Sequence, residues 1–143
     1  MTDGKLWLCL GAILAGTAVG AGAFAAHGLD GYFAKKYSGQ EREQAGIKIP
    51  ASQKYLADFK TGAEYQMYHA LALLAIGLLA LQRPSTSLNV AGWSFVVGIV
   101  LFSGCLYLLT VTGQRWLGAI VPIGGTAFLI GWISLAIAAF RLR

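Results

Sequence analysis

The stretch that decides the fold reads Tyr65-Gln66-Met67-Tyr68-His69-Ala70-Leu71-Ala72-Leu73-Leu74-Ala75-Ile76-Gly77-Leu78-Leu79-Ala80-Leu81. This run has no charged residue, and it carries one ionisable imidazole, that of His69, near its start. A helix needs about 20 apolar residues to cross the hydrocarbon core of a bilayer. We therefore predict a membrane-spanning helix over residues 63–81, in which His69 must find a partner or a water-lined cavity.

The rest of the chain repeats this pattern. Of its 143 residues, 57% are hydrophobic and only 12% are charged, whereas an average soluble domain has about 25% charged residues. Three further uncharged runs predict spans over residues 6–26, 90–111 and 116–140. The prediction for residues 1–143 is a single all-α integral membrane domain of four transmembrane helices in an antiparallel bundle.

The long polar segment, residues 27–62, lies between the first two spans and holds most of the charged residues. Aromatic and basic residues alternate between Tyr32 and Tyr37, which is typical of a segment anchored among lipid headgroups. After Pro50, a helical period places Tyr55 and Phe59 on one face and charged residues on the other, which predicts a short interfacial amphipathic helix. The piece from Ser38 to Lys48 has little apolar content, as is typical of a mobile segment.

Small residues in the spans predict close helix packing, because they let two backbones approach. The positions expected to pack are Gly16, Gly20, Gly22, Gly104, Gly124 and Gly125. A cleavable signal peptide is the rival interpretation of the first run, since Lys5 precedes it and Ala23-Phe24-Ala25 resembles a cleavage site. The run is longer than the apolar region of a typical leader, which favours a retained span.

The basic residues predict an orientation. Four antiparallel spans put both termini on one side, with four basic residues there and seven on the other side: Lys5, Arg83, Arg141 and Arg143 against Lys35, Lys36, Arg42, Lys48, Lys54, Lys60 and Arg115. Because cytoplasmic loops carry the excess of Lys and Arg, we expect an inner-membrane protein with the long loop inside and the termini outside. The net charge of +5 is explained by these flanks and by anionic lipid, so it requires no nucleic acid.

A polar layer is expected near the long-loop side of the membrane. His69, Tyr107 and the segment from Gly118 to Pro122 fall at a similar depth, on the order of 7 Å into the bilayer. A proline inside the fourth span would free the carbonyl of Gly118, which His69 or Tyr107 could then satisfy. The same residues could instead form a proton relay or a ligand site, and the proline with Gly124-Gly125 could break the helix as in transporters.

His27 and Asp30 form a polar corner at the same membrane face. His27 and His69 together could hold haem or a quinone, but no third ligand and no haem-attachment motif accompany them, so we expect no metal and no cofactor. Cys9 and Cys105 should lie about 18 Å apart in depth, too far for a disulfide, and we expect two free, buried thiols.

Four segments stand out along the chain. They read Gly22-Ala23-Phe24-Ala25-Ala26-His27-Gly28-Leu29, then Thr61-Gly62 with Tyr65-Gln66-Met67-Tyr68-His69-Ala70-Leu71-Ala72-Leu73, then Phe102-Ser103-Gly104-Cys105-Leu106-Tyr107-Leu108-Leu109, and finally Leu117-Gly118-Ala119-Ile120-Val121-Pro122-Ile123-Gly124-Gly125. Together they resemble the signatures of the domain-of-unknown-function family 423. The resemblance implies a small multi-pass membrane protein and brings no established activity with it.

The chain departs from that family's pattern at four places. Cys105 stands where the family has serine, Val121 where it has threonine, and Glu64 where it has arginine. The first two differences weaken a polar relay through the layer, and the third leaves a role for Glu64 in doubt. Residues 38–53 resemble an insertion, which could be a lineage-specific contact surface.

These observations predict a non-enzymatic protein. No pair of nucleophile and base, phosphate-binding glycine loop or pair of intramembrane acids is present in the sequence. We expect an accessory or assembly component of a membrane complex, in contact with the bilayer and with a membrane-protein partner or a second copy of the chain. The alternative is a small-solute or proton pathway formed by an oligomer through His69, Tyr107 and Pro122.

Overall fold

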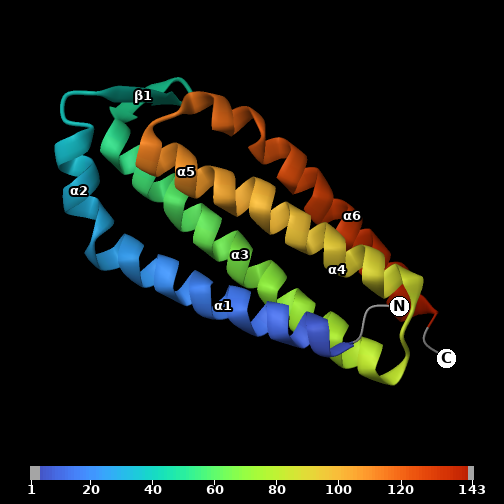
Figure 1. Ribbon diagram of the computed structural model, residues 1–143. Helices are drawn as coiled ribbons and strands as arrows, with labels where there is room; N and C mark the ends of the chain where they lie inside the picture. The colour runs from blue at the N-terminus through green and yellow to red at the C-terminus, as the bar shows by residue number, and fades with distance from the viewer. Residues whose placement is uncertain (1–3, 142–143) are drawn as a thin grey trace.

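The computed structural model describes residues 4–141 as an elongated bundle of long helices with a small cap at one end (Figure 1). In chain order the elements are α1 (Gly4–His27), α2 (Leu29–Lys36), β1 (Glu41–Gln44), β2 (Ile47–Pro50), α3 (Ala51–Gln82), α4 (Thr86–Gly98), the π-helix η1 (Ile99–Gly104), α5 (Cys105–Thr112), the 3-10 helix η2 (Arg115–Ala119) and α6 (Val121–Phe140).

Four helical segments are long and apolar enough to cross a membrane, as the sequence predicts. They are Gly4–His27, Ala51–Gln82, Thr86–Thr112 and Arg115–Phe140. α1 packs mainly on α3 and α6 packs mainly on α4, so α3 and the third span form the centre of the bundle. In Figure 1, α1 and α6 accordingly lie on opposite sides of these central helices.

The second span is longer than expected because its helix starts earlier. Pro50 has an extended backbone and α3 begins directly after it, at Ala51. A helix of 32 residues is about 48 Å long, which exceeds the hydrocarbon core of about 30 Å. The amphipathic segment predicted after Pro50 is therefore not a separate interfacial helix. It forms the first turns of α3, and its Tyr55 and Phe59 are buried in protein.

The cap has its own small core beside that of the spans. Leu29 and Phe33 of α2 pack there with Tyr55 and Phe59 of α3 and with Leu109 of α5. Between α2 and α3, where the sequence has little apolar content, the chain forms an antiparallel hairpin, β1 with β2. Its two turn residues, Ala45 and Gly46, have φ of 51° and 79°, which is the geometry of a tight two-residue hairpin turn. Each strand has only four residues, and β1 is polar throughout, so the alternation of Ile47-Lys48-Ile49 in β2 is too short to reveal the hairpin.

Glycines in the bundle accept aromatic rings from neighbouring helices. A Cβ on Gly92 would lie 2.6 Å from the ring of Trp7, one on Gly98 2.3 Å from Phe128, and one on Gly131 2.4 Å from Phe95. The last two contacts are reciprocal, since each of α4 and α6 gives one ring and one glycine. This packing locks α6 onto α4.

Most of the glycines expected to pack do not do so within this chain. Gly124 does, because a Cβ there would lie 2.5 Å from the backbone nitrogen of Phe102 in the wide π turn η1. Added Cβ atoms on Gly16, Gly20, Gly22 and Gly125 would meet nothing within 4 Å, and one on Gly104 would meet only the Ile99 carbonyl oxygen at 3.9 Å. The packing predicted for these five positions inside the bundle is therefore wrong.

The two cysteines are free, as expected. Cys105 is buried, but Cys9 is exposed on α1, so the prediction of a buried thiol is wrong for Cys9. α1 exposes Cys9 because only one side of this outer helix packs on α3.

Candidate functional site

His69 is almost fully buried, at 4% exposure, and both of its ring nitrogens are engaged. Nδ1 lies 2.6 Å from the carbonyl oxygen of Tyr65, one turn earlier in α3. Nε2 accepts a hydrogen bond of 3.1 Å from Nε1 of Trp132 on α6. A carbonyl can only accept and an indole N–H can only donate, so the neutral imidazole with its proton on Nδ1 satisfies both partners.

Aromatic rings enclose this imidazole. The Phe128 ring stacks on it with centroids 3.5 Å apart and planes at 4°, and Phe95 lies 5.2 Å away on the α4 side. On the outer surface between α3 and α6 this cluster borders a cavity of about 380 Å³, lined also by Tyr65, Tyr68, Gly125, Leu129 and Trp132. The cavity is mainly apolar. Gly125 has no side chain, and an added Cβ there would meet nothing within 4 Å, so this residue adds to the open space.

A second polar cluster lies around Gln66, which is 6% exposed. Its Nε2 donates to the carbonyl oxygen of Leu14 at 2.9 Å and to Oγ1 of Thr17 at 2.8 Å. Its Oε1 accepts a hydrogen bond of 3.0 Å from the hydroxyl of Tyr107. One amide thus connects α1, α3 and α5. Sequence reasoning missed Gln66, although an amide inside an apolar run was a usable signal.

The structure divides the predicted polar layer between these two clusters. Tyr107 donates to Gln66, whereas His69 bonds to Trp132. Gly118 lies in η2, and Pro122 stands in the first turn of α6. The fourth span changes from the 3-10 helix η2 to the α-helix α6 at Ile120, next to Pro122, so the proline stands at a junction within the span. Tyr107 and His69 bond to Gln66 and Trp132, so the prediction that one of them satisfies the Gly118 carbonyl is wrong.

The polar corner lies apart from His69. His27 is the last residue of α1 and Asp30 belongs to α2, and both are exposed. Aromatic contacts of His69 come from Tyr65, Phe95, Phe128 and Trp132 instead. Within residues 4–141, no three His, Cys, Asp or Glu side chains are grouped as a metal site. A haem or metal held by His69 would have to displace Trp132 from Nε2.

Polar side chains also attach the cap to the second and third spans. The hydroxyl of Tyr37, which is 6% exposed, donates to the carbonyl oxygen of Thr110 at 2.7 Å. Lys36 donates to the carbonyl of Val111, and the Arg42 guanidinium holds the Tyr55 hydroxyl through Nε at 3.0 Å. Burial raises the pKa of the Tyr37 phenol above its ordinary value, and the nearby Lys36 ammonium partly opposes that shift.

Known proteins resemble this chain over almost its whole length. Residues 21–125 match the family described as "Protein of unknown function (DUF423)". The UPF0382 membrane protein YwdK of Bacillus subtilis is 46% identical over 138 residues, which cover 96% of this chain and 98% of that protein. The UPF0382 membrane protein SAB0533 of Staphylococcus aureus is 47% identical, with 96% and 97% covered. No solved structure matches the chain.

Proposed function

Because the chain belongs to the DUF423 family of membrane proteins, whose description assigns no activity, we propose from its structure that it is a non-enzymatic accessory or assembly component of a membrane complex. One observation carries this proposal: two of the buried polar side chains in the spans, those of His69 and Gln66, join one helix to another. His69 binds α6 through Trp132, and Gln66 binds α1 and α5. Polar side chains that are hydrogen-bonded between helices stabilise the bundle, and these two are therefore not available to bind or activate a substrate.

The surface that we assign to the partner is the outer face of α1. In the apolar window of α1 only 17% of residues are buried, against 44% for α3. Gly16 and Gly20 are exposed there, and a Cβ on either would meet nothing within 4 Å. Exposed glycine lowers helix stability and gains nothing against lipid tails, whereas it allows a second helix to approach closely. The expected occupant is a transmembrane helix of a partner protein.

Gentle purification from native membranes at natural abundance, followed by mass spectrometry and determination of particle mass, tests this function. We expect a foreign membrane protein at fixed stoichiometry. Gly16→Leu with Gly20→Leu should leave the fold intact, because open space surrounds both positions, and should remove the partner. Ala136→Leu with Ala139→Leu is the matched control, since both residues are exposed on α6. A homo-oligomer that retains only lipid would overturn the proposal.

A proton or solute pathway through an oligomer is the weaker candidate. Its residues are divided, with Tyr107 bonded to Gln66 and His69 bonded to Trp132, and no observed hydrogen bond links the two clusters. Replacing His69 by Leu separates the two functions. Loss of folded protein or of assembly favours the accessory role, whereas intact protein with lost flux favours the pathway. A coloured preparation, or one that holds a quinone or a metal, would favour the cofactor alternative.

The proposed location is the inner membrane, with the cap in the cytoplasm and the termini outside. The cap end carries Lys35, Lys36, Arg42, Lys48, Lys54, Lys60 and Arg115. Basic residues beside the spans favour the cytoplasmic side. The length of α3 supports a cap that projects beyond the hydrocarbon core.

A further inference from the structure

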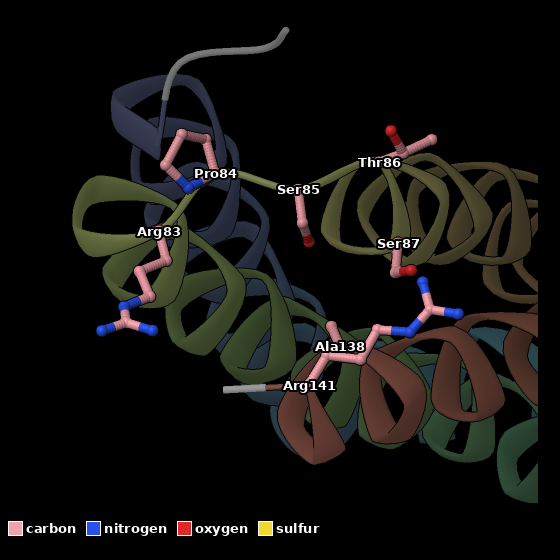
Figure 2. A pocket seen from close by; sticks show the side chains of 7 residues that line it. All are labelled: Arg83, Pro84, Ser85, Thr86, Ser87, Ala138 and Arg141. Carbon is pink, nitrogen blue, oxygen red and sulfur yellow. The ribbon is translucent and has the colours of Figure 1, made fainter. Parts of the chain in front are cut away.

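A small polar cavity lies at the end of the bundle opposite the cap. It has a volume of about 200 Å³ and is formed where the turn between α3 and α4 meets the end of α6. Figure 2 shows its lining, which includes Arg83, Ser85, Thr86, Ser87, Ala138 and Arg141. Among residues 4–141, the lining includes three hydroxyl side chains and the guanidinium of Arg141 and no carboxylate, so the cavity favours an anion.

The first turn of α4 supplies backbone donors to this cavity. Ser85 caps the helix, and its Oγ accepts the N–H of Leu88 at 3.3 Å, while its carbonyl accepts the N–H of Asn89 at 3.2 Å. Thr86 and Ser87 come before the first N–H that can reach a carbonyl of the same helix. Their N–H groups, together with the positive end of the helix dipole, are a known setting for phosphate.

Arg141 brings a full positive charge to the same place. Its side chain leaves the end of α6 and extends toward Ser87, as Figure 2 shows, while Arg83 lies across the opening and points away. Ala138, one turn before Arg141, also lines the cavity and is 5% exposed. Its methyl side chain occupies little of the cavity. A guanidinium offers two parallel N–H donors, which match two oxygens of a phosphate.

The position of the cavity indicates which phosphate-containing molecule would reach it. α3 ends at Gln82, α4 begins at Thr86 and α6 ends at Phe140, so three spans leave the membrane at this level. The phosphates of phospholipids lie at the ends of spans, just outside the hydrocarbon core. We propose that this cavity binds the phosphate of an anionic phospholipid, with Arg141, the Ser87 hydroxyl and the first turn of α4 as its ligands.

Lipid binding to the full-length protein, measured by native mass spectrometry and by titration in nanodiscs, tests this site. With phosphatidylglycerol as the probe, Arg141→Gln should weaken binding about fivefold, the effect of one interfacial charge. Ser87→Ala should weaken it less. Arg115→Gln is the matched control because Arg115 begins η2 at the opposite end of the bundle, and it should leave binding at this site unchanged. Phosphatidylcholine should bind weakly to all four proteins.

Three outcomes would overturn the proposal. Equal losses for Arg141→Gln and Arg115→Gln would show attraction to overall charge and no site. Inorganic phosphate that stabilises the detergent-solubilised protein with the same dependence on Arg141 would identify a free anion as the ligand. Unchanged lipid binding in both Arg141→Gln and Ser87→Ala would show that the cavity holds no headgroup. Arg141 is exposed, and unchanged thermal unfolding of its variant would exclude misfolding as the cause.

Discussion

The hydrogen bond between Trp132 and His69 is the only observed side-chain hydrogen bond between α3 and α6 in residues 4–141. Trp132→Phe removes the indole N–H and keeps a ring beside Phe95. We expect the free energy of unfolding to fall by about 1 kcal/mol, since one hydrogen bond is lost and Nε2 of His69 is left without a donor. Reversible denaturation in mixed detergent micelles measures this change. Unchanged stability would mean that the Tyr65 carbonyl and ring stacking hold His69 without the indole N–H.

Tyr37 makes the attachment of the cap depend on pH. Burial raises the pKa of its phenol above 10.0, its ordinary value, so the unfolded chain loses this proton at a lower pH than the folded protein does. The stabilisation is therefore complete below pH 10.0 and declines as pH rises through the higher pKa of the folded state. Tyr37→Phe lacks the bond to Thr110 and should be less stable by about 1 kcal/mol at neutral pH.

Comparing the stability of the wild type with that of Tyr37→Phe at alkaline pH separates the effect of Tyr37 from that of the other tyrosines and the lysines. The stability difference between wild type and Tyr37→Phe should shrink above pH 10.0, because only the wild type loses this contribution. Thermal unfolding at a series of pH values measures it. A difference that stays constant would show that the phenol titrates equally in the folded and unfolded states.

Sequence reasoning located His69 as a buried polar residue but assigned it the wrong neighbours. Counting residues along each span gives depth, and by depth His69 and Tyr107 are close. Depth does not give the direction in which a side chain points around its helix. Tyr107 reaches Gln66 on one side of α3, whereas His69 reaches Trp132 of α6, 63 residues further along the chain. A hydrogen bond between residues so far apart in the sequence leaves no pattern in the sequence around either residue.

At the scale of elements, the four spans were predictable and their packing faces were not. An apolar run long enough to cross a membrane is almost always a helix, because its backbone N–H and C=O groups must bond to one another where no water is present. The interior of the bundle and the lipid around it are both apolar, however, so hydrophobic periodicity does not show which glycine faces inward. Gly131 and Gly125, both in α6, illustrate this, since only Gly131 meets a ring.

Alanine substitutions at Gly131 and Gly125 test the packing between α4 and α6. Gly131→Ala places a Cβ 2.4 Å from Cε1 of Phe95, which forces the ring or the helix to move. We expect the free energy of unfolding to fall by about 1–3 kcal/mol. Gly125→Ala, in open space on the same helix, should be neutral or slightly stabilising. The same detergent denaturation compares both variants, and equal effects would contradict the ring-in-glycine contact.

The whole molecule consists of two stacked parts, an apolar bundle and a polar cap built on the extension of α3. The cap begins within α3 because Pro50 starts that helix about three turns before the apolar run. Tyr37, Lys36 and Arg42 then fasten α2 and the hairpin to the spans. The two ends of the molecule therefore differ in size and charge, and this difference makes its orientation in the membrane measurable.

Cysteine labelling in intact cells tests the proposed orientation. In a variant with Cys9 and Cys105 replaced by serine, Glu43→Cys places a thiol on β1 in the cap, and Thr86→Cys places one at the opposite end; both native positions are exposed. A membrane-impermeant maleimide should label Thr86→Cys in intact cells and Glu43→Cys only after the membrane is opened, because the larger group of basic residues lies in the cap. The reverse result would place the cap outside. Labelling of both thiols in intact cells would indicate that the protein inserts in two orientations.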